Sequence, residues 1–237
     1  MNHTTLIIPD KPDVERDAVA AAWRASGGDM LRVDRFWVRP DVAPERVALY
    51  GPDTFCLVIA QLLGLNLLSP PDDLLLKAAP VLTWRRIRGT TLSTALDGPF
   101  PLFAKPLQPK QLQFRARVWG SAQELSQECA GLAPETAIIV AEVVEIAAEA
   151  RAWVMDGRVA TCAVYDGTAA VDAAAAFVAY AAAELALPEV CVVDCALVDG
   201  TWCLLEANAA WGAGLNGCDA SAVVPCIDRA TRIAEGP

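Results

Sequence analysis

The sequence predicts an α+β protein in which a small Rossmann-like α/β layer precedes a larger domain of hairpins and helices. Three observations indicate this fold class. Strand-like and helix-like patterns alternate up to residue 68, a Ser-Pro-Pro-Asp-Asp stretch then interrupts the alternation, and several hairpin signals follow. We therefore expect the α/β layer to span residues 1–72 and the second domain to span residues 73–237.

Local signals define the elements of the first layer. Asp13 suits the N-cap of a helix because its carboxylate can accept from free backbone N–H groups, and Gly64 suits the left-handed residue that ends one. The expected elements are strands at residues 4–9, 31–37 and 47–50 and helices at residues 13–26 and 53–63.

The second domain carries more hairpin signals than helices. Ser121-x-x-Glu124 has the form of a capping box, and Asp156-Gly157 that of a tight hairpin turn. The expected elements are short and long helices at residues 74–79 and 169–187, strands at 102–105, 113–119, 137–142, 149–155 and 159–165, a hairpin at 190–198 and 201–208, and a last helix at 224–234 with Pro225 in its first turn.

Composition excludes several classes of partner. With a net charge of -10, the protein is a poor partner for nucleic acid or an anionic membrane, because both attract Lys and Arg. The longest apolar run, residues 173–183, is shorter than the roughly 20 residues that span a bilayer, and residues 1–10 carry no secretory signal. We expect a cytoplasmic location, with the eight cysteines as buried thiols. The sequence leaves the oligomeric state open, a homodimer included.

Common catalytic sites are also excluded. His3 is the only histidine, so a nucleophile-histidine pair has no base in the body of the chain, and zinc lacks its usual ligands. No lysine follows a glycine, which rules out a Walker-type phosphate loop. Gly212-x-Gly214-x-x-Gly217 matches a dinucleotide fingerprint literally, but it has no following βαβ unit. These glycines either let the backbone pass close to a ligand or form an ordinary loop.

The hairpin near the end of the chain contains three oxygen-bearing side chains. Glu206 and Asn208 share one face because side chains alternate along a strand. A three-residue connection with Gly200 in a bulged turn sets Asp194 beside them, whereas a two-residue type I′ turn puts the two carboxylates on opposite faces. In the first register the three groups suit Mg²⁺ held together with nucleotide phosphates.

Two further pairs of charged residues are candidates for a phosphate site. Lys105 ends an apolar strand, and Lys110 follows on a proline-bounded loop. A packed stem with a free ammonium group suits phosphate, although such lysines often only reach solvent. Glu149 and Arg151 share one strand face, where a simple surface ion pair would contribute about 0–1 kcal/mol.

The order of these residues resembles the ATP-grasp superfamily, and more narrowly a clade of small bacterial and phage ATP-grasp proteins. The motifs that carry the resemblance are Tyr50-Gly51, Phe103-Ala-Lys-Pro106, Glu149-Ala-Arg151, Val193-Asp194 and Leu205-Glu-Ala-Asn208 with the glycines that follow. The resemblance implies two α+β subdomains, residues 73–141 and 142–237, that grip ATP, with residues 1–72 as a pre-ATP-grasp domain. The chain departs from the superfamily in having no glycine between residues 106 and 117, where Lys110, Arg115 and Arg117 stand instead.

The resemblance also implies a role for each candidate residue. Lys105 and Lys110 would bind phosphates, and Arg151 would face the terminal phosphate, so Arg151 and Lys110 are the catalytic candidates. The expected ATP-binding set is Lys105, Lys110, Glu142, Val143, Val144, Glu149 and Arg151, with Glu142 to Val144 at the adenine and Glu149 at the ribose. The expected metal ligands are Asp194, Glu206 and Asn208, for two Mg²⁺ ions.

The function that this site implies is an ATP-dependent carboxylate-amine ligase acting through an acyl-phosphate, with small-molecule or peptide carboxylates and amines as substrates. Two alternatives stay open, a small-molecule kinase that uses the same ATP site and a non-catalytic nucleotide-binding module. The sequence also leaves open the roles of Arg85, Arg86, Arg88, Arg117 and Trp211, which could contact substrate or only pack or meet solvent.

Overall fold

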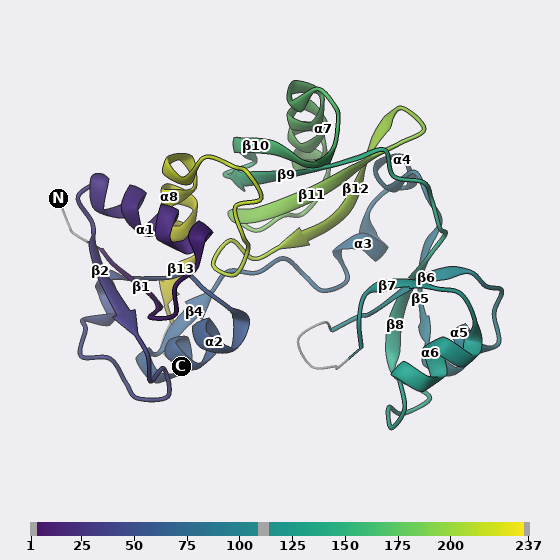
Figure 1. The fold of residues 1–237 in the computed structure, drawn as a ribbon, viewed down its shortest axis with the longest axis horizontal. Coiled ribbons are helices and arrows are strands. Elements are labelled where there is room, and N and C mark those ends of the chain that lie inside the picture. Colours follow the sequence, from purple (N-terminus) through teal and green to yellow (C-terminus); the bar gives the residue numbers. More distant parts are fainter. Residues whose placement is uncertain (1–3, 109–113, 235–237) are drawn as a thin grey trace.

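The computed structural model describes residues 4–108 and 114–234. Within these residues the chain forms three parts built on four β-sheets, and Figure 1 shows them as a row with the N-terminal part at one end. The middle part carries the longest strands, and its sheet faces the other two parts. The candidate site residues lie mainly on this middle sheet and on the sheet of the third part.

The first part is a three-stranded parallel sheet with the order β2-β1-β3. Its elements are β1 (Thr5–Pro9), α1 (Val14–Ala25), β2 (Asp29–Val33), a 3₁₀ turn η1 (Pro44–Arg46), β3 (Val47–Leu49) and α2 (Asp53–Leu63). Asp13 caps α1 as predicted, accepting from the Arg16 N–H at 3.0 Å, and Gly64 ends α2 with φ 71°. The strand predicted at residues 31–37 is wrong at both ends. It begins at Asp29 and ends at Val33 because its partner β1 ends opposite Val33, at Pro9.

The end of the chain returns to this first part. Strand β13 (Thr231–Ile233) pairs antiparallel with β4 (Leu65–Leu67), and α8 (Ala220–Arg229) packs against α1. The helix predicted at residues 224–234 is therefore placed wrongly. It begins earlier because the Asp219 carboxylate caps the Ser221 and Ala222 N–H groups, which leaves Pro225 inside the helix, and it ends where β13 starts.

The second sheet has the order β5-β8-β6-β7 and forms the part farthest from the N-terminal end (Figure 1). Its strands are β5 (Ile87–Thr91), β6 (Leu102–Pro106), β7 (Arg117–Trp119) and β8 (Ala137–Ala141), with α5 (Leu92–Leu96) and α6 (Ala122–Glu128) over one face. The Ser121 hydroxyl caps α6 as predicted. The strand predicted at residues 113–119 is shorter than expected, since the described residues before Arg117 are not in a strand.

Two short helices precede this sheet where one was predicted at residues 74–79. They are α3 (Leu74–Lys77) and α4 (Pro80–Thr83). Ala79 has an extended backbone with ψ 144°, as expected for a residue that precedes proline, so the helical run is interrupted and Pro80 starts a new turn.

The middle sheet has the order β10-β9-β11-β12, with all neighbouring strands antiparallel. Its strands are β9 (Ala148–Met155), β10 (Arg158–Gly167), β11 (Val190–Val198) and β12 (Thr201–Asn208). Helix α7 (Val171–Glu184), shorter than the predicted 169–187, covers one face with an apolar core. The opposite face adds Trp153, Val190 and Val192 to the core of the first part. The sheet is therefore fixed to the N-terminal part by packing.

The eight cysteines are free thiols, and all but the half-buried Cys162 are buried. Burial raises the pKa of the Cys191 thiol to about 12, and the neighbouring Cys226 adds to the effect. As a separate observation, the described helices of residues 4–108 and 114–234 include none that is both long and apolar enough to cross a bilayer.

Substitutions on α2 test the packing of the first part. We expect Ile59→Ala to lower the free energy of unfolding by about 2–5 kcal/mol, because the side chain is fully buried and its loss leaves a cavity. Leu57→Ala on the same helix is the control, since Leu57 is 45% exposed, and it should change the free energy by no more than about 0.5 kcal/mol. Urea denaturation measures both, and equal losses would contradict this packing.

Candidate functional site

The hairpin of β11 and β12 brings Asp194 to the same face as Glu206 and Asn208, by a route that differs from the predicted one. The connection is a two-residue turn with φ 48° at Asp199 and φ 77° at Gly200, so the expected three-residue connection is wrong. Regular pairing from this turn would set Asp194 opposite Leu205. A β-bulge at that point leaves Leu205 without an opposite residue and pairs Asp194 with Glu206.

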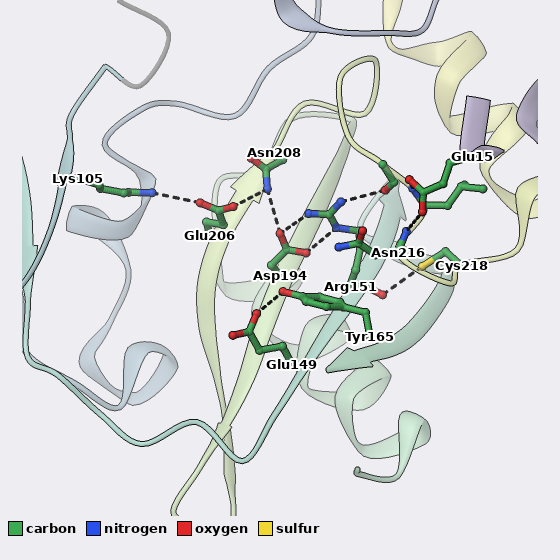
Figure 2. Close-up of polar contacts among 12 residues, drawn as sticks. Glu15, Lys105, Glu149, Arg151, Tyr165, Asp194, Glu206, Asn208, Asn216 and Cys218 are labelled. Carbon is green, nitrogen blue, oxygen red and sulfur yellow. Dashed lines mark hydrogen bonds and ion pairs between the residues drawn. The ribbon is translucent and has the colours of Figure 1, made fainter. Parts of the chain in front are cut away.

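A continuous polar network links these residues across three strands (Figure 2). Arg151 lies opposite Asp194 on β9 and donates to its two carboxylate oxygens from Nε and Nη2, both at 2.7 Å. The Asn208 amide donates to Asp194 Oδ2 at 3.1 Å and to Glu206 Oε1 at 3.0 Å. Lys105, from β6 of the other sheet, donates to Glu206 Oε2 at 3.4 Å.

Burial controls the electrostatics of this network. The side chain of Asp194 is only 4% exposed, and burial raises the pKa of its carboxyl while the Arg151 guanidinium acts in the opposite direction. Burial acts to lower the pKa of Arg151, but the hydrogen bonds and charge of Asp194 outweigh it and raise that pKa. Such a pair is stable only while both partners are present, because either charge alone would be buried without a counter-charge.

A cleft of about 290 Å³ lies between the middle sheet and the second sheet, beside this network. One end is apolar and the other is charged, an arrangement that suits a ligand with a flat ring and an anionic tail. The lining residues are Arg85, Phe103, Lys105, Ala116, Val118, Glu142, Val143, Val144, Ile146, Glu149, Tyr165, Asp194, Leu205 and Glu206. A smaller cavity of about 180 Å³ shares Lys105 and Glu206 with the cleft and also touches Asn208 and Asp72.

The segment expected to bind adenine connects the two sheets. The Glu142 N–H donates to the Arg86 carbonyl at 3.0 Å, and its side chain accepts from the Arg86 N–H at 3.4 Å. Val143 and Val144 follow and line the apolar end of the cleft, where the Val143 side chain is 40% exposed. The structure thus places all three residues of this predicted set at one end of the cleft.

Tyr165 is a residue of the cleft that the sequence reasoning missed. Its hydroxyl donates to Glu149 Oε2, and burial and this carboxylate raise the pKa of the phenol. Tyr165 reaches Glu149 because a bulge in β10 leaves it without a regular partner between Val164 and Asp166. A bulge produces no departure from the alternating sequence pattern, so no signal pointed to Tyr165.

Three residues whose roles the sequence left open make contacts within the protein. Arg85 donates to the Leu204 carbonyl at 2.8 Å, and burial lowers the pKa of its guanidinium. The Arg117 guanidinium stacks on the Trp119 ring at 3.9 Å. Trp211 is buried and donates from Nε1 to the Leu68 carbonyl at 3.0 Å, so it packs.

The oxygen-bearing set fits a hard divalent cation by its chemistry. It offers two carboxylates and one amide on adjacent strands, joined by hydrogen bonds of 3.0 and 3.1 Å. Among residues 4–108 and 114–234, no group of three or more His, Cys, Asp or Glu side chains gathers as a metal site. A cation held here would therefore depend on the Asn208 amide oxygen, on nucleotide oxygens and on water. Lys110, the remaining candidate, lies outside the described residues, as does His3.

Comparisons with known proteins agree with this geometry. The sequence matches a family described as an ATP-grasp domain, the second family of its clade, over residues 82–226. No curated protein matches the chain significantly.

Several solved structures share the fold at low identity. A RimK domain ATP-grasp protein from Sphaerobacter thermophilus superposes with a TM-score of 0.62 at 13% identity, covering 94% of this chain and 99% of the other. D-alanine-D-alanine ligase from Bacillus anthracis gives 0.54 at 11% identity, with 96% and 97% covered. N5-carboxyaminoimidazole synthase from Aspergillus clavatus gives 0.61 at 12% identity, with 96% and 77% covered.

These matches confirm the predicted ATP-grasp fold. The family match spans more than half of the chain and includes every described candidate residue from Lys105 to Asn208. The chain therefore belongs to the ATP-grasp superfamily, within the clade family that its sequence matches.

Proposed function

We propose that the protein is an ATP-dependent carboxylate-amine ligase that works through an acyl-phosphate and releases ADP and phosphate. One observation carries the proposal. The Lys105 ammonium group faces Glu206, Asn208 and Asp194 at the charged end of a cleft whose other end is apolar. Several named structural neighbours are ligases or synthases, which supports this class of reaction.

The proposed nucleotide position follows from the two ends of the cleft. Val143 and Val144 contact the adenine together with Glu142, and Glu149 takes the ribose hydroxyls in place of the Tyr165 hydroxyl. Lys105 binds the phosphates, and Lys110 belongs to the same proposal. We also propose that residues 1–72 form the pre-ATP-grasp domain, that the subdomains are residues 73–141 and 142–237, and that the protein is cytoplasmic.

The chemistry asks the chain mainly for positioning and charge neutralisation. A substrate carboxylate oxygen attacks the terminal phosphorus of ATP, the bond to the ADP oxygen breaks, and an amine then displaces phosphate from the acyl carbon. Asp194, Glu206 and Asn208 would hold two Mg²⁺ ions, which when bound neutralise phosphate charge. Arg151, already beside Asp194, faces the terminal phosphate. No enzyme nucleophile takes part.

Removal of the Lys105 ammonium group tests nucleotide binding. We expect Lys105→Met to weaken binding of Mg-ATP by about tenfold or more, because a charge-assisted contact to phosphate is lost. Lys77→Met is the control, since Lys77 is 66% exposed and pairs with Asp73 away from the cleft. Isothermal titration calorimetry measures both variants, and equal affinities for the two would contradict the proposed phosphate contact.

Removal of one carboxylate tests the metal set. Electron paramagnetic resonance of Mn²⁺ with a non-hydrolysable ATP analogue should count two ions per chain in the native protein and fewer in Glu206→Gln, since an amide is a weaker ligand than a carboxylate. Glu184→Gln, on the exposed side of α7, should keep the native count. An unchanged count in Glu206→Gln would remove this residue from the metal set.

Trapping with hydroxylamine tests the acyl-phosphate. Incubation with Mg-ATP, hydroxylamine and a panel of amino acids and short peptides should yield a hydroxamate and ADP for at least one carboxylate, and Glu206→Gln should abolish both products. A kinase would release ADP with a hydroxyl acceptor and form no hydroxamate. ADP formation without hydroxamate, or full activity of Glu206→Gln, would contradict the ligase assignment.

A further inference from the structure

The N-terminal part reaches the candidate site through Glu15, a residue that the nucleotide cleft does not include. Glu15 lies in the first turn of α1, and its two carboxylate oxygens accept from successive backbone N–H groups of the loop after β12. The Leu215 N–H lies 2.9 Å from Oε2, and the Asn216 N–H lies 2.8 Å from Oε1 (Figure 2). Both are charge-assisted hydrogen bonds that fix the loop against α1.

One peptide group connects Glu15 to Arg151. The Leu215 N–H and the Gly214 carbonyl belong to the same planar trans peptide, so they point in opposite directions. The N–H faces Glu15, and the carbonyl accepts from Arg151 Nη1 at 3.0 Å. A carboxylate that binds the N–H therefore sets the direction of the carbonyl, and it also strengthens that carbonyl as an acceptor.

Arg151 is held from two sides as a result. Asp194 takes Nε and Nη2 on one side, and the Gly214 carbonyl takes Nη1 on the other. Since a guanidinium group has five N–H donors in a rigid plane, these contacts fix its orientation and leave donors for a ligand. Only 12% of the Arg151 side chain is exposed, so the guanidinium has little freedom to turn.

The glycine at position 214 follows from the same arrangement. A Cβ atom placed there would lie 2.5 Å from Glu15 Oε2 and 3.8 Å from Arg151 Nη1. Glu15 would have to move away, which would break its bonds to the loop. The close approach of a carboxylate from α1 therefore explains this glycine of the G-x-G-x-x-G sequence.

We propose that Glu15 is a positioning residue, which orients the Gly214-Leu215 peptide so that the Arg151 guanidinium faces the terminal phosphate of ATP. The inference rests on the proposed contact between Arg151 and that phosphate. It assigns to the N-terminal part a role in distinguishing ATP from ADP, although Glu15 itself touches neither nucleotide.

Nucleotide discrimination tests this role directly. We expect Glu15→Gln to reduce the preference for a non-hydrolysable Mg-ATP analogue over Mg-ADP by about fivefold, since an amide keeps one acceptor oxygen and loses one charge-assisted bond. Affinity for Mg-ADP should stay within about twofold of the native value, because the ADP contacts remain. Calorimetric titrations with both nucleotides measure the two quantities, and equal losses for both would indicate a merely structural role and overturn the inference.

Asp17→Asn is the matched control for the helix. Asp17 lies on α1, and the substitution makes the same change from carboxylate to amide, but its partner is Arg32 on β2 and not the loop. This variant should keep the native preference for the triphosphate. A loss equal to that of Glu15→Gln would assign the effect to α1 as a whole and contradict the inference.

A double-mutant cycle removes the dependence on any one variant. Gly214→Ala alone should reduce the triphosphate preference, because its Cβ displaces the Glu15 carboxylate. In the Glu15→Ala background the same substitution should add little, since the carboxylate that it would meet is absent. Losses that add fully would show that the two positions act independently and would contradict the proposal.

Arg151→Lys separates failure of the inference from failure of the proposed function. An unchanged triphosphate preference in Arg151→Lys would show that Arg151 does not contact the terminal phosphate, which overturns both. A loss in Arg151→Lys with native preference in Glu15→Gln and Gly214→Ala would overturn the positioning role alone.

Discussion

A one-residue bulge in β12 decides where the charged groups of the cleft lie. Regular pairing from the turn would put Asp194 and Glu206 on opposite faces, and the bulge at Leu205 sets them opposite each other instead. Asp194 is then buried and needs a counter-charge, which Arg151 supplies from the neighbouring strand. Asn208 and Glu206 extend the same network to the edge of the sheet, so the polar end of the cleft depends on this register.

The two sheets that enclose the cleft have separate apolar cores. Lys105 and Glu206 form an ion pair across the cleft at 3.4 Å, and Glu206 is 42% exposed. Exposed pairs of this kind contribute only about 0–1 kcal/mol, so phosphate groups can replace the carboxylate as the partner of Lys105 at low cost. The middle sheet, in contrast, is fixed to the N-terminal part by a shared core, by β13 and by Glu15.

The sequence predicts well those features that local chemistry determines. Asp13, Gly64 and Ser121 end or begin helices through bonds to nearby backbone groups, so their roles are readable without tertiary information. The bulges at Leu205 and Tyr165 are not readable, because side-chain alternation looks the same with or without an extra residue. Glu15 was also missed, since its partners lie 200 and 201 residues away.

The central claim is that ATP binds with its phosphates between Lys105 and the set of Asp194, Glu206 and Asn208. A crystal structure with Mg²⁺ and a non-hydrolysable ATP analogue tests it most directly. The account predicts adenine against Val143 and Val144, phosphates at Lys105, and a metal ion touching Glu206. A nucleotide bound elsewhere, such as the cavity of about 560 Å³ beside Arg86 and Arg88, would contradict it.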